Sequence, residues 1–173
     1  MGTAAVAVAG TLLGALIGAL STYYSQKASY RRESDERQKT VRRQVYVDWL
    51  REGHQFYRAI GAIWRKHRGA TDLTAVAAEL RVLAPEAAQV ALEHLRLISG
   101  EEVAASAASL WAHLRRQPVP LGQDMSEQGW IKWSDHYYRL RRAFMDAARV
   151  DLGLSPFDWD RAGVGPGNHR EYP

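Results

Sequence analysis

Four histidines are the residues best suited to chemistry, because imidazole titrates near neutral pH and ligates metals. His54, His94, His113 and His136 fall on four different predicted helices, and a helical bundle could gather them into a metal site. Bundles that hold metals with carboxylates and imidazoles use a Glu-x-x-His pair, which places both ligands on one helix face. That pair does not occur in the sequence. The histidines are therefore expected at the boundary or surface of the fold, with no metal or other cofactor.

Familiar catalytic motifs are missing as well. The chain has no Gly-x-Ser-x-Gly, no Gly-x-x-x-x-Gly-Lys and no His-Glu-x-x-His, and it has no cysteine for a thiolate site. Gly163, Gly165 and Gly167 follow no strand and precede no helix, so they indicate a tail rather than a phosphate-binding loop. Asp48 and Glu52 lie one turn apart and are interpreted as charges on a solvated helix face. We therefore predict that the protein is not an enzyme.

Basic residues stand beside aromatic ones in two places, a pattern that nucleic-acid-binding surfaces share. Residues 64–68 read WRKHR, and residues 137–142 read YYRLRR. The first cluster lies at a predicted helix C-terminus, where cations offset the helix dipole. In the second, Tyr137 and Leu140 belong to an apolar stripe and the arginines are expected to point away. Nearness to a membrane explains the positive charge at least as well, so nucleic acid is not expected as a partner.

The N-terminal run indicates that membrane. Residues 3–24 read TAAVAVAGTLLGALIGALSTYY and carry no charge, and about 20 apolar residues span the hydrocarbon core of a bilayer. We therefore predict a transmembrane anchor in residues 1–24. Tyr23 and Tyr24 close the run, where aromatic residues favour the interface. A cleaved signal peptide is the competing interpretation, but no Lys or Arg precedes the run, and the run exceeds the about 7–15 apolar residues of a signal peptide.

Small residues recur at every fourth position of this run. Gly10, Gly14, Gly18 and Thr22 lie on one helix face and would let a second helix backbone approach closely. In lipid, such packing drives helix association. The stripe predicts a helix–helix interface, either with a second copy of the chain in a homo-oligomer or with another membrane protein.

Basic residues follow the run directly and predict its orientation. Lys27, Arg31 and Arg32 are expected to contact lipid head groups. Lys and Arg near the end of a span remain in the cytoplasm. We therefore expect a single-pass protein of the bacterial inner (cytoplasmic) membrane, with its N-terminus outside and residues 25–173 in the cytoplasm.

Helical periodicity continues through most of the remaining chain. The sequence predicts a basic juxtamembrane helix over residues 25–44, a cytoplasmic helical bundle over 45–153 and an irregular Gly/Pro-rich tail over 154–173. The expected fold class is all-α. The N-terminal transmembrane helix should continue into the long helix of an antiparallel four- to five-helix bundle.

Turn and cap signals divide the bundle. Gly69 should end the long helix and Gly153 the last one, which should start after Ser126. Ser99 and Glu102 form a capping-box pattern before the fourth helix. Residues 118–125 are expected to form a loop.

The predicted core consists of apolar residues that repeat in steps of three, four or seven. The core candidates are Trp49, Phe56, Ile60, Leu110, Leu114, Trp133, Tyr137 and Phe144. Gly53 is expected to let a neighbouring helix pack closely. Phe157 and Trp159 could dock onto the bundle, because a solvated tail rarely needs two large aromatics.

Two stretches, VAVAGTLLGALIGAL with the basic helix after it and the late AARVDLGL, carry a family resemblance. They resemble uncharacterised actinobacterial single-pass membrane proteins with a cytoplasmic helical domain. The resemblance covers both ends of the chain and implies the same layout of anchor and bundle. It implies no activity and no site residues.

Three functions are compatible with these patterns. The first is a membrane-tethered helical interaction or scaffold module, which self-associates or binds a partner through its glycine-striped helix and contacts membrane lipid. The second is an oligomeric membrane-permeabilising effector. The third is a ligand- or metal-binding helical bundle, which would depend on the scattered histidines.

Overall fold

The computed structural model describes residues 2–69, 73–116, 126–159 and 161. Side chains are described from Thr22 onward within these ranges, except at positions 28, 31 and 73. The described residues form five α-helices and no strand, so the predicted all-α fold class is confirmed.

The helices differ greatly in length. Their bounds are α1 Gly2–Lys66, α2 Leu73–Val82, α3 Glu86–Ile98, α4 Glu101–Arg116 and α6 Glu127–Asp151. The chain divides into two units, Met1–Val41 and Arg42–Pro173, and α1 contributes to both.

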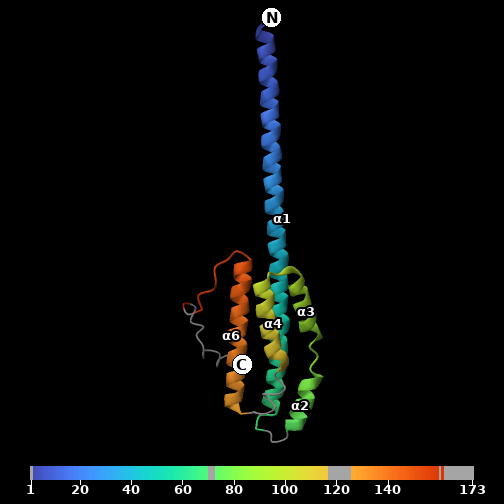
Figure 1. The fold of residues 1–173 in the computed structure, drawn as a ribbon. Coiled ribbons are helices and arrows are strands. Elements are labelled where there is room, and N and C mark those ends of the chain that lie inside the picture. The colour runs from blue at the N-terminus through green and yellow to red at the C-terminus, as the bar shows by residue number, and fades with distance from the viewer. Residues whose placement is uncertain (1, 70–72, 117–125, 160, 162–173) are drawn as a thin grey trace. The chain divides into compact units, whose positions relative to one another are not determined.

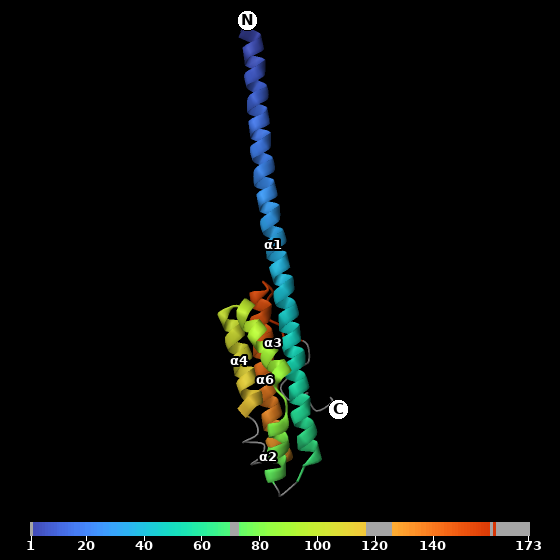
Figure 2. The ribbon, with the colours of Figure 1, turned by 90° about the vertical axis from the view of Figure 1, so that its right-hand side faces the viewer.

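The second unit is an up-and-down helical bundle. Within it α4 packs beside α6 and α3, and its part of α1 lies on the opposite side from α4 (Figure 2). The helices α2 and α3 follow one another along one side, and they and α6 run opposite to α1 and α4 (Figures 1 and 2). Residues 83–85 separate α2 from α3. Pro85 causes this break, since it has no N–H to donate and disfavours helical backbone at Ala84. The two short helices therefore take the place of one long bundle helix.

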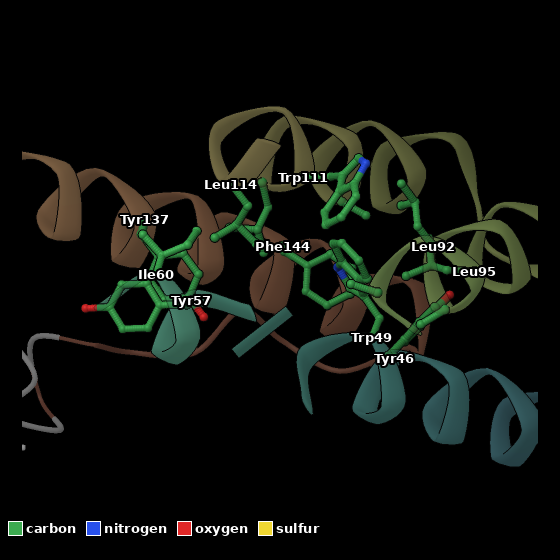
Figure 3. Packing of buried hydrophobic residues seen from close by; sticks show 14 of the residues in the cluster. Tyr46, Trp49, Tyr57, Ile60, Leu92, Leu95, Trp111, Leu114, Tyr137 and Phe144 are labelled. Atoms are coloured by element: carbon green, nitrogen blue, oxygen red, sulfur yellow. The ribbon is translucent and has the colours of Figure 1, made fainter. Parts of the chain in front are cut away.

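Large apolar side chains from every helix of the bundle fill its centre. Figure 3 shows those of α1, α3, α4 and α6. The fully buried ones include Trp49, Tyr137, Phe144, Leu92, Leu95, Leu110, Leu114, Val76 and Val103. Of the other core candidates from the sequence, Ile60 is 2% exposed and Trp133 6% exposed, and Phe56 is half-buried against the cluster. Burying a large apolar side chain contributes about 1.5–3 kcal/mol each, so this cluster is the main source of stability.

The helix ends follow local signals in three places. Gly69 and Gly153 adopt φ +77° and +78°, which favours glycine after a helix C-terminus. The Ser126 side chain accepts a hydrogen bond from the Gly129 N–H at 3.0 Å and caps α6.

The capping box predicted before α4 is wrong. The Ser99 hydroxyl is buried and has no hydrogen-bond partner among the described residues, while the Ser99 N–H donates to Leu95 as the C-cap of α3. The helix α4 begins at Glu101, so Gly100 rather than Ser99 stands at its N-cap position, and Ser99 ends α3 instead.

Several predictions concern parts of the chain beyond the described residues. They include the loop at 118–125 and the glycine run at 163–167. Where side chains are described, no helix is sufficiently long and hydrophobic to traverse a bilayer. The predicted span at 3–24 lies outside that part of the chain, apart from Thr22, Tyr23 and Tyr24.

Candidate functional site

The residues predicted to meet a membrane lie on the first unit. The side chains of Gly10, Gly14, Gly18 and Arg31 are outside the described residues. Thr22, Tyr23, Tyr24, Lys27 and Arg32 are all exposed on α1. The ammonium of Lys27 lies 6.0 Å from the centre of the Tyr23 ring, a cation–π contact along the helix surface.

The acidic residues that follow take other basic partners. Glu33 forms an ion pair with Arg37, and Glu36 with Lys39 at 3.1 Å. Lys27 has no carboxylate within 4.0 Å among the described residues. The charge at Lys27 therefore remains available to an external anion.

Among the histidines, His113 and His136 are brought together by the packing of α4 on α6. Their ring centroids are 4.7 Å apart. His113 also stacks on Trp133, and its Nε2 lies 3.2 Å from the Trp133 carbonyl oxygen. A carbonyl only accepts, so Nε2 carries the proton. Burial, with His136 nearby, lowers the pKa of His113 to about 4.

His54 lies apart from this pair, on α1. Its ring stacks on Tyr57 at 5.7 Å, and Nδ1 is 3.4 Å from the Tyr137 hydroxyl. Burial lowers the pKa of His54, and the charges of Arg141 and Arg58 lower it further. The sequence-based view that the arginines after Tyr137 all point away is wrong for Arg141, whose Nε is buried without a hydrogen-bond partner among the described residues.

No metal centre emerges from these groups. Among the described residues, no three His, Cys, Asp or Glu side chains converge as a metal would require. Asp48 and Glu52 both pair with Arg51, at 2.9 and 3.1 Å, and so are occupied on the helix surface.

Aromatic rings form a continuous stack between α1 and α6. Tyr57 lies parallel to Tyr137 with centroids 4.1 Å apart, and to Trp133 at 5.4 Å (Figure 3 shows the two tyrosines). Trp130 extends the stack to Trp64 at 5.0 Å. The Tyr57 hydroxyl reaches Ser134 at 2.7 Å. Offset stacking of this kind contributes about 0.5–1.5 kcal/mol per pair beyond burial. The stack therefore stabilises the packing of α1 against α6.

A polar junction at the other end of the bundle joins α1 to the end of α6. The Asp151 carboxylate accepts hydrogen bonds from the Tyr46 hydroxyl at 2.6 Å and from Arg42 at 3.2 Å. Burial, together with this carboxylate, raises the pKa of Tyr46 well above its ordinary value. Sequence reasoning missed this junction, because the partners are 105 and 109 positions apart.

The segment after α6 folds back onto that helix. The Asp146 carboxylate accepts hydrogen bonds from the Phe157 N–H at 3.0 Å and from the Trp159 indole N–H at 3.0 Å. The Arg142 guanidinium lies 5.4 Å from the Trp159 ring centre. The two aromatics after Gly153 therefore dock on the bundle.

A cavity of about 240 Å³ lies between α1, α2 and α4. Its lining residues are Phe56, Ile60, Leu80, Arg81, Leu83, Pro85, Leu114 and Arg115. Phe56, Ile60 and Leu114 are among the predicted core residues, whereas Arg81 and Arg115 bring two positive charges to the same space. Sequence reasoning missed both arginines; the available signal was an arginine directly beside an apolar core position on each helix, Leu80 and Leu114.

Comparison with protein-family models, with curated proteins and with solved structures finds no match for this chain.

Proposed function

We propose that the protein is a membrane-anchored interaction module. In this proposal residues 3–24 cross the bacterial inner membrane once, with the N-terminus outside, and the helical bundle lies in the cytoplasm. The protein has no catalytic role, and it works by holding its bundle at the membrane beside a partner.

The uncharged run at residues 3–24 is the observation that carries this proposal. The run is long enough for the hydrocarbon core, and α1 includes it without a break. The exposed Tyr23 and Tyr24 end the run and the available charge of Lys27 follows it, which suits the head-group region.

The partner would bind through the small-residue stripe. Gly10, Gly14, Gly18 and Thr22 share a face on which a second helix can approach closely. The simplest partner is a second copy of the same chain, and another single helix in the bilayer would use the same face.

Membrane fractionation with a matched pair of variants tests the anchor. Leu13→Arg places a charge in the middle of the run, which costs about 2.5–3.5 kcal/mol on insertion scales, whereas Leu13→Ile keeps the run apolar. After carbonate washing, the wild-type chain and Leu13→Ile should stay in the membrane pellet, and a large share of Leu13→Arg should be released. A wild-type chain found wholly in the soluble fraction would refute the proposal.

The same cells report on the permeabilising alternative. An anchored scaffold should leave the membrane potential unchanged when the chain is expressed. Collapse of the potential with the wild-type chain, but not with Leu13→Arg, would replace the scaffold function by pore formation.

A further inference from the structure

The cavity between α1, α2 and α4 combines an apolar wall with unpaired positive charge. Phe56, Ile60 and Leu114 supply part of its wall. Arg81 and Arg115 are both exposed, and neither has a carboxylate within 4.0 Å among the described residues. Arg42 and Arg68, in contrast, each form an ion pair with a carboxylate.

A second hollow in the same part of the bundle differs from this cavity in its charged groups. Leu83 also lines this second hollow, of about 420 Å³, together with Ile63, Ala78, Glu79 and Val82. Its one charged lining residue is a carboxylate, which already pairs with Lys66 at 2.7 Å. Of these two hollows, the smaller one therefore combines apolar side chains with arginines that have no carboxylate partner among the described residues.

We propose that this cavity binds a single-chain amphiphile with an anionic head, of the medium-chain carboxylate class. The acyl chain would lie along Phe56, Ile60 and Leu114, and the carboxylate would accept hydrogen bonds from Arg81 and Arg115. Arginine suits this role because its planar guanidinium matches a carboxylate.

The volume limits the length of the chain. A dry cavity of about 150 Å³ lined by Leu, Ile and Phe accommodates benzene, with its six carbons. By that ratio, 240 Å³ holds roughly ten non-hydrogen atoms. Decanoate is therefore a suitable probe: its ten carbons match that space, and its two carboxylate oxygens would lie at the arginines that border the cavity. The site lies wholly in the second unit, and binding there goes beyond the anchoring function and does not require it.

Calorimetric titration of the full chain with decanoate tests the site. An amphipathic polymer should keep the protein in solution, because detergent would compete for the cavity, and polymer alone provides the blank. Decanoate should bind at least about tenfold more tightly than decanol or decyltrimethylammonium, since a charge-assisted hydrogen bond to arginine is worth a factor of that order. Equal binding of all three compounds would overturn the proposal.

Two pairs of variants locate the binding. Arg81→Gln with Arg115→Gln should weaken decanoate binding about tenfold and leave decanol binding unchanged. Arg65→Gln with Arg116→Gln removes the same charge away from the cavity and should change neither. If both double variants weaken decanoate binding equally, general electrostatic attraction explains the result and the site is refuted.

The second pair of variants tests whether the ligand occupies the space of the cavity. Leu83→Trp should fill the cavity and abolish binding of decanoate and decanol, whereas Val82→Trp, at a position 82% exposed and outside the lining, should not. Circular dichroism confirms that each variant is folded. Decanoate carrying a terminal diazirine should label the lining residues, and labelling confined to residues 3–24 would refute the site, because it would mean adsorption to the apolar run.

Discussion

Gly53 and Gly61 lie two turns apart on α1, but they meet different surroundings. A Cβ at Gly61 would lie 3.1 Å from the Trp130 ring, whereas at Gly53 the nearest atom would be Leu114 Cδ1 at 3.9 Å. The close approach that the sequence assigns to Gly53 therefore occurs at Gly61. Gly61 is the position where the indole of α6 reaches the backbone of α1.

These distances predict opposite outcomes for alanine substitutions. Gly53→Ala should stabilise the fold by about 0.5–1 kcal/mol, because alanine loses less backbone entropy in a helix and its methyl fits. Gly61→Ala should give no such increase in the free energy of unfolding, because its methyl would force the Trp130 ring to move. Gly69→Ala should destabilise, because φ is +77° there. Thermal unfolding followed by circular dichroism measures all three, and a destabilised Gly53→Ala would contradict the packing described at that position.

The neutral His113 predicts a pH dependence of stability. An unfolded histidine titrates near pKa 6.5, and the folded pKa of about 4 means that the unfolded chain takes up its proton first. The free energy of unfolding should therefore fall as pH drops from about 7 to about 4 and level off below. Because His113 is only partly buried, we expect a loss of about 1–2 kcal/mol.

Matched variants assign this effect. His113→Gln, whose amide can still donate to the Trp133 carbonyl, should flatten the change in unfolding free energy between pH 7 and pH 5. His94→Gln, at an exposed position on α3, should retain the wild-type slope. The same slope in both variants would show that another group titrates.

Between elements, the Asp151 junction attaches the end of α6 to α1. Tyr46→Phe removes the hydrogen bond to a carboxylate whose side chain is 15% exposed, and should cost about 1.5–3 kcal/mol. Tyr23→Phe, at a position 58% exposed, is the control and should be neutral. A Cβ at Gly100 would lie 2.9 Å from Asp151 Oδ1, so Gly100→Ala should displace the same carboxylate.

A double-mutant cycle in denaturant decides whether this junction acts as one unit. Tyr46→Phe and Gly100→Ala should be less than additive in unfolding free energy, because each disturbs the same acceptor. Full additivity would mean that the two contacts are independent.

The small-residue stripe of α1 makes a prediction about helix association. Gly14→Leu should reduce self-association of the anchor in a membrane reporter assay, because the side chain prevents close approach of two backbones. Ala15→Leu adds the same bulk on a different face and should associate like the wild-type chain. Equal loss in both variants would argue against the stripe as the interface.

For the molecule as a whole, flanking charge should determine orientation. Changing Lys27, Arg31, Arg32 and Arg37 to Gln, with three lysines inserted after Met1, should invert a substantial fraction of molecules, because Lys and Arg near a span stay in the cytoplasm. External protease would then cut the bundle in intact cells. If the wild-type bundle is already cut there, the orientation is wrong. If the variant stays protected, something other than flanking charge sets the topology.

Local sequence patterns were sufficient to predict which helix faces are buried and where several helices end. Spacings of three and four select Trp49, Leu114 and Phe144, and these side chains are buried. An amphipathic helix buries its apolar face in any fold, regardless of which neighbour packs on that face. Gly153 and Ser126 end and begin α6 because backbone conformation and capping depend on a few adjacent residues. The uncharged run at 3–24 is equally local, because its length and composition can be read without any partner.

Packing between helices decided the rest. No spacing indicates that Asp151 meets Tyr46, that His113 meets His136, or that two separate arginines border one cavity. Each depends on how far one helix is rotated and shifted against another, and that depends on the shapes of all the side chains between them. A sequence shows which face of a helix is buried, but the neighbour on that face is selected by the packing of the whole bundle.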